Sequence, residues 1–186
     1  MHKRVLFISM LIVTLFIASN LFGNEDSNDP CSIKLLPSSI QDTLRNKFPD
    51  WHVVTMKDLG KDDQELWKKS LNGGNCPGIT LGHYEKSAYL SYAISMVPSR
   101  ANITGNRLIV FSPNSKGTYK ERYLEKYNGS SSPLVVYTVP PGDYQEVEEG
   151  KRITLFKEGF QWEAIEQGAT LYYYQGGKYH QLLVSE

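Results

Sequence analysis

The sequence lacks an excess of charge of either sign. Twenty lysines and arginines face twenty aspartates and glutamates, so the formal net charge at pH 7 is zero. A protein that binds nucleic acid needs a basic face to neutralise phosphates, and a membrane-surface binder that works by charge needs a basic cluster. We therefore expect no nucleic-acid partner and no strongly electrostatic membrane binding.

The sequence also lacks a hydrophobic run long enough to cross a membrane comfortably. Its longest apolar run, residues 5–18, holds about fourteen residues, whereas a membrane-spanning helix needs about 20. The run follows a short basic segment and precedes small residues, which is typical of a signal peptide. We expect residues 1–23 to be cleaved, after Ser19 or Gly23, with an uncleaved N-terminal anchor as the alternative. The protein would then be exported, periplasmic or extracellular, with no stable membrane span after cleavage.

Cysteine is scarce, since the chain has only Cys31 and Cys76. An even pair in an exported chain predicts a disulfide. The bond would close a loop of about 45 residues, and the chain-entropy model then gives about 4 kcal/mol of stabilisation. The alternative is a free Cys76 nucleophile with His83 as its base, as in a thiol hydrolase.

Familiar catalytic and metal motifs are absent from the sequence. No serine lies in a G-x-S-x-G turn, and no glycine-rich loop matches a phosphate-binding pattern. His52, His83 and His180 are isolated from one another, so we expect no metal site and no cofactor. A carboxylate pair for glycoside or peptidoglycan cleavage is an alternative, although crowded acids are most often solvated. Its candidates are Asp143, Glu146, Glu148 and Glu149.

Helical signals concentrate before residue 72. Ile40, Leu44 and Phe48 recur every four residues and are followed by Pro49, which predicts a helix that starts near Pro37. A second helix is expected over 61–70, where acids begin the segment and lysines end it.

Strand signals dominate after residue 72, with one earlier strand. Strands are expected at 51–55, 79–84, 89–97, 107–111, 134–139, 153–156, 160–165, 169–174 and 178–184. Residues 118–127 fit either helix or strand, residues 143–150 indicate a loop, and Gly176-Gly177 indicates a two-residue hairpin.

This segregation predicts an α+β fold, with N-terminal helices packed on or beside a mainly antiparallel β-sheet. Residues 24–30 would be a disordered lead-in. Residues 31–186 would form one globular domain, because about 160 residues suffice for a single core.

Tyrosine is abundant, with twelve residues. Tyr172 and Tyr174 share one face of an expected strand, and Tyr179 lies across the hairpin from them. The structural interpretation is cross-strand aromatic pairing. The functional interpretation is an exposed partner-binding surface for a protein or an envelope glycan.

Several short motifs occur in a distinctive order: LPSSI…KFPDW, NCPGITLGHY, SYAISM, VPPGDY and ATLYYYQGGKYHQLLVSE. This order resembles a loosely defined group of uncharacterised exported bacterial proteins with a Cys-Pro-Gly turn and a tyrosine-rich C-terminal hairpin. Some members resemble single FG-GAP-type elements, in which an aspartate-rich loop holds calcium. The matching residues 82–89 contain one acid, Glu85, so we expect no calcium there.

The sequence thus predicts an exported, non-enzymatic binding or interaction domain of unknown partner. A cell-envelope hydrolase and a structural accessory protein of the envelope are the alternatives. The disulfide Cys31–Cys76 and the surface of Tyr172, Tyr174 and Tyr179 are the predicted sites.

Overall fold

The computed structural model describes residues 29–70, 76–86, 88–129, 132–148 and 150–185. The expected signal peptide, 1–23, and most of the expected lead-in, 24–30, lie outside these residues. Within them, no helix is both long and apolar enough to cross a membrane.

Strands make up most of the regular structure. The helices are η2 (Ile33–Leu35), α1 (Ser38–Lys47) and α2 (Lys61–Ser70). The strands are β1 (Trp51–Val53), β2 (Ile79–Gly82), β3 (Ser91–Pro98), β4 (Asn106–Pro113), β5 (Tyr119–Tyr127), β6 (Val135–Val139), β7 (Gly142–Gln145), β8 (Arg152–Leu155), β9 (Gly159–Ala164), β10 (Gly168–Gln175) and β11 (Lys178–Ser185). The predicted α+β class is therefore wrong, and the described chain is a mainly antiparallel β-protein.

The class is wrong because the helices are short and the strands are many. Each α-helix has ten residues and offers only one stripe to the core. Residues 118–127, which fitted either state, form β5. The expected loop at 143–150 contains most of β7, whose residues pair with β8.

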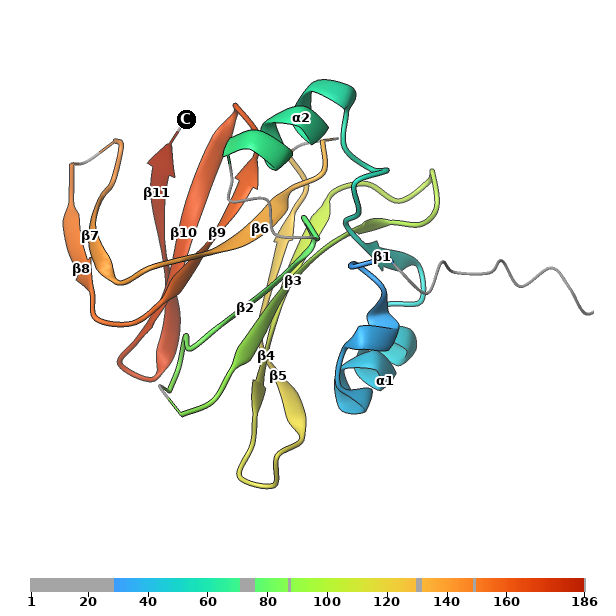
Figure 1. The fold of residues 1–186 in the computed structure, drawn as a ribbon, viewed down its shortest axis with the longest axis horizontal. Coiled ribbons are helices and arrows are strands. Elements are labelled where there is room, and N and C mark those ends of the chain that lie inside the picture. Colours follow the sequence, from blue (N-terminus) through green and yellow to red (C-terminus); the bar gives the residue numbers. More distant parts are fainter. Residues whose placement is uncertain (1–28, 71–75, 87, 130–131, 149, 186) are drawn as a thin grey trace, which may run out of the picture.

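The strands form two main sheets, and all their pairings are antiparallel (Figure 1). In the first sheet the order is β1-β3-β4-β5, and β2 pairs with the other half of β3. In the second sheet the order is β11-β10-β9-β6. The edge strands β2 and β6 are joined where the hydroxyls of Thr80 and Thr138 lie 2.8 Å apart.

The two sheets pack face to face around an aromatic core. Because successive strand residues point to opposite faces, Leu108 and Val110 of β4 point to the second sheet, where Phe160 and Tyr172 lie. The Phe160 and Tyr172 rings stack with centroids 5.3 Å apart.

Each outer sheet face has its own cover. Helix α1 packs Ile40 and Leu44 against β3 and β4 on the first sheet, and the β7–β8 hairpin covers Leu171 and Tyr173 on the second (Figure 1). Helix α2 places Trp67 in a third cluster, against Val135 and other apolar residues.

The predicted hairpin at Gly176-Gly177 is confirmed. It joins β10 to β11, and both glycines have positive φ angles, of 60° and 88°. A two-residue turn that matches the strand twist needs φ above zero at both positions, which glycine adopts without strain.

Candidate functional site

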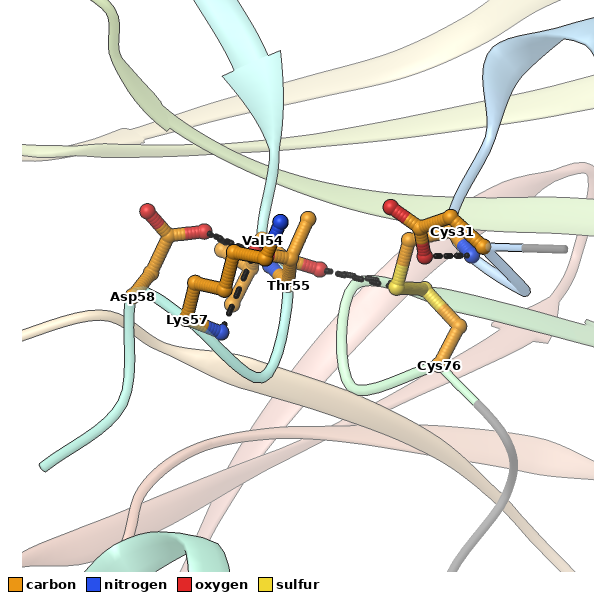
Figure 2. The surroundings of a disulfide bond; sticks show 7 residues. Cys31, Val54, Thr55, Lys57, Asp58 and Cys76 are labelled. Atoms are coloured by element: carbon orange, nitrogen blue, oxygen red, sulfur yellow. Dashed lines mark hydrogen bonds between the residues drawn. A yellow bond between two sulfur atoms is a disulfide. The ribbon is translucent and has the colours of Figure 1, made fainter. Parts of the chain in front are cut away.

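The predicted disulfide is present and joins the segment before α1 to the turn before β2 (Figure 2). The Cα atoms of Cys31 and Cys76 are 5.0 Å apart, and both residues are buried. Their sulfur atoms lie 3.4 and 3.7 Å from the carbonyl oxygen of Val54, as contacts, because a disulfide has no S–H proton. Neither cysteine is free, so the alternative of a Cys76 nucleophile is wrong.

A groove of about 1000 Å³ opens beside this bond, and we call it the disulfide groove. Its floor is apolar and includes Cys31, Phe48 and Met96, all of them buried. Its walls include the half-buried side chains of Trp51 and Met56. The groove thus offers apolar and polar surface together, and concave sites with both are the usual place for a small ligand.

Two positive side chains lie among the residues that line the disulfide groove. Arg45 and Lys57 line it, and within the described residues neither has a carboxylate partner. Arg45 donates only to the neutral Gln41 side chain, at 3.2 Å. Asp29, the acid that lines the groove, accepts a hydrogen bond from the backbone N–H of Cys31 at 2.9 Å.

A third cation, Arg107, packs against two aromatic rings that line the groove. Its guanidinium carbon is 4.3 Å from the centre of the Trp51 ring and 5.5 Å from that of Phe48. Its Nε atom is buried and has no hydrogen-bond partner among the described residues. Cation–π contact with two rings therefore holds Arg107 in place and fixes Trp51.

His52 lines the groove and contacts two polar side chains that lie outside the lining, Ser99 and Asp58. The His52 ring places Nδ1 3.2 Å from the Ser99 hydroxyl and Nε2 2.9 Å from Asp58 Oδ1. The other oxygen of Asp58 accepts hydrogen bonds from the backbone N–H and the hydroxyl of Thr55, at 2.7 and 2.8 Å. Figure 2 shows Asp58 on the side of Val54 away from the disulfide.

These contacts hold Asp58 in its charged form. Partial burial alone would raise the pKa of the Asp58 carboxyl, but hydrogen bonds from His52 and Thr55 outweigh burial, so the pKa lies below its ordinary value.

The predicted tyrosine surface is divided by the fold. Tyr172 is 2% exposed and belongs to the core between the sheets, so its ring is not on a surface. Tyr174 and Tyr179 are opposite each other in the β10–β11 register, half-buried, with ring centroids 5.1 Å apart. Tyr174 and Tyr179 therefore form a cross-strand aromatic pair, as the structural interpretation expects.

The hydroxyl of Tyr179 donates a hydrogen bond to a buried acid, Glu85, in the loop after β2. The carboxylate of Glu85 accepts from Ser112 at 2.8 Å and from Tyr179 at 3.2 Å, and pairs with Arg122 at 3.4 Å. Lys157 donates to its backbone carbonyl at 2.7 Å. We call this set, with Tyr174, the tyrosine end. Glu85, the acid within residues 82–89, is therefore engaged by the protein's own donors.

His83, His180 and Asp143 each contact a different partner. His83 lies 3.3 Å from Glu158, and the His180 ring stacks on Tyr173. Asp143 accepts from the Thr154 hydroxyl at 2.6 Å. Across the described ranges, no three or more His, Cys, Asp or Glu side chains gather in a way that could hold a metal.

No sequence motif points to Ser99, Asp58 or Arg107, and His52 is isolated from the other histidines in the sequence. No motif connects Ser99 with His52, which lie 47 residues apart. His52 lies inside one expected strand, 51–55, and Ser99 follows another, 89–97, but the pairing of the two strands cannot be predicted from either segment alone.

Comparison of the chain with protein-family models, with curated proteins and with solved structures gave no match in any of the three.

Proposed function

We propose that this protein is an exported binding domain, and that it holds a ligand with an apolar body and an acidic group in the disulfide groove. The observation that carries the proposal is the combination of an apolar floor with two rim cations, Arg45 and Lys57, that lack acid partners in the described part of the chain.

The charge of the groove supports the acidic group. Some cations of the described chain pair with an acid, as Lys47 does with Glu121 at 3.0 Å. Within the same residues Arg45 and Lys57 do not, although both line an apolar hollow. An anion bound between an apolar floor and two cations would gain hydrophobic burial and charge-assisted hydrogen bonds together.

The disulfide supports export, because such bonds persist mainly in oxidising compartments. It also supports the groove itself. Cys31 forms part of the floor, and the bond ties the segment on one side of the groove to the turn before β2, so the site is held open before a ligand arrives. A preformed site loses less conformational entropy when it binds.

Tryptophan fluorescence tests the proposal directly. The chain has three tryptophans. Trp67 and Trp162 are buried, at 2% and 5% exposure, whereas Trp51 lines the groove. Titration of the oxidised protein with decanoate should change the emission in a saturable way, and the Trp51→Phe variant should lose that change.

The matched ligand control is decanol, which has the same chain length and no acid. We expect decanol to bind about tenfold more weakly than decanoate, since it lacks the charge-assisted hydrogen bonds. The Arg45→Ala/Lys57→Ala variant should bind the two equally. Equal binding by the wild type, or no saturable change with decanoate, would contradict the proposal.

A further inference from the structure

We propose that Ser99, His52 and Asp58 form a hydrolytic site at the edge of the disulfide groove, which cleaves esters of apolar carboxylic acids. The choice of substrate rests on the proposed function, since hydrolysis of such an ester releases an apolar carboxylate, the kind of ligand that the groove fits.

The hydrogen-bond directions follow from the charge of Asp58. A carboxylate only accepts hydrogen bonds, and hydrogen bonds hold the pKa of Asp58 low. The proton of a neutral His52 ring must therefore be on Nε2, which faces Asp58 Oδ1 at 2.9 Å. This leaves Nδ1 as an acceptor, so the Ser99 hydroxyl 3.2 Å away must donate to it. That is the orientation that a general base needs toward a serine nucleophile.

The backbone fixes each of the three groups. His52 pairs with Val97 in the β1–β3 register, which brings it beside the end of β3. The N–H of Ser99 donates to the Asp50 carbonyl at 2.8 Å. Asp58 is held through both the N–H and the hydroxyl of Thr55. Such positioning before substrate binds is what catalytic groups require.

The site is accessible from the solvent and from the groove. Ser99 is exposed, and the His52 side chain is 41% exposed. His52 itself lines the groove, together with Met56 and Lys57. An ester whose acyl chain occupies the apolar floor would thus reach Ser99 through the side of the groove that His52 lines.

The amide of Ser99 is already bonded to the Asp50 carbonyl, so this amide does not stabilise an oxyanion. Lys57 is the candidate, as it lies in the Thr55–Asp58 turn and its ammonium has no acid partner in the residues described.

The reaction is a two-step hydrolysis. The Ser99 oxygen attacks the ester carbonyl while His52 Nδ1 takes the serine proton, the C–O bond to the alcohol breaks, and the alcohol leaves with that proton. Water then attacks the acyl-serine with His52 again as the base. This releases the carboxylic acid and restores Ser99, so one ester and one water give one acid and one alcohol. Asp58 is a positioning residue that keeps the ring in the required tautomer.

Two assays on the oxidised full chain test the site. The first is labelling by an alkyl fluorophosphonate, which a reactive serine attacks with loss of fluoride, followed by mass spectrometry of the labelled peptide. The second is hydrolysis of p-nitrophenyl decanoate. We expect the label on Ser99, and at least a hundredfold loss of hydrolysis in Ser99→Ala and His52→Ala.

Ser115→Ala is the matched control, because Ser115 is an exposed serine in the turn between β4 and β5, and it should keep full activity. Asp58→Asn should lower kcat at least tenfold with little change in KM, and Lys57→Met should also lower kcat. No hydrolysis above buffer, or equal labelling of Ser99→Ala, would overturn the site. The decanoate titration separates the two proposals. Decanoate should change the Trp51 emission of Ser99→Ala as it changes that of the wild type, whether or not the serine is catalytic.

Discussion

The disulfide groove and the tyrosine end both gather polar and aromatic side chains, and they differ in how those side chains are partnered. At the tyrosine end, Glu85 accepts from Ser112 and Tyr179 and pairs with Arg122. At the groove, Arg45 and Lys57 have no acid partner within the described residues. A satisfied buried network stabilises a fold, whereas unpaired charge beside an apolar hollow is available to a ligand.

The same contrast separates two histidines. His83 contacts Glu158, away from the groove. His52 has an acid on one ring nitrogen and a serine hydroxyl on the other, and it lines the groove. Only the second arrangement has a base, a nucleophile and a place for substrate.

Removal of the disulfide should have the largest effect on stability. The Cys31→Ser/Cys76→Ser variant frees a loop of 45 residues, so the free energy of unfolding should fall by about 4 kcal/mol. Urea denaturation of the variant and of reduced wild type should agree with each other. A difference from oxidised wild type below about 1 kcal/mol would show that the bond does not hold the groove.

Disruption of the tyrosine end should come second. Glu85→Ala leaves the buried hydroxyl of Ser112 and the partly buried hydroxyl of Tyr179 without their acceptor, so the free energy of unfolding should fall by about 2 kcal/mol. Glu65→Ala is the control, because its pair with Lys69 is exposed and should contribute at most about 0.5 kcal/mol. Decanoate binding should be unchanged in Glu85→Ala, and a loss of binding there would move the ligand site to this end.

The smallest effect concerns pH. Because the folded-state pKa of Asp58 lies below its ordinary value of 3.8, its carboxylate stabilises the fold at neutral pH, and that contribution is lost as the pH falls from about 4 through the folded-state pKa. Asp58→Asn should therefore be about 1 kcal/mol less stable at pH 7 and should lose less stability between pH 5 and pH 2. Parallel melting-temperature curves for the two proteins would contradict this.

Local features of the fold were predictable from the sequence, and long-range ones were not. The helix at 61–70 and the turn at Gly176-Gly177 depend on residues close together in the sequence. Acids begin the helix, and both glycines of the turn adopt a positive φ. The fold class was wrong because it depends on how many strands pair, and residues such as 142–145 form a strand only against β8.

The candidate site shows the same limit. The disulfide could be predicted, since it needs only two cysteines and an oxidising compartment. The alternation of side chains along a strand correctly put Tyr172 and Tyr174 on one face. The sequence of the strand does not say whether that face packs against the other sheet, because this depends on the tertiary structure. The contact between His52 and Ser99 depends on the β1–β3 register, to which neither segment alone gives a clue.

Chemical-shift mapping tests the difference between the two regions most directly. In ¹H–¹⁵N spectra of the oxidised protein titrated with decanoate, we predict saturable shifts at the amides of Ile33, Trp51 and Lys57, which line the disulfide groove, and unchanged signals at Tyr174 and Tyr179. Shifts that concentrate at Tyr174 and Tyr179 and leave Trp51 unchanged would contradict the account.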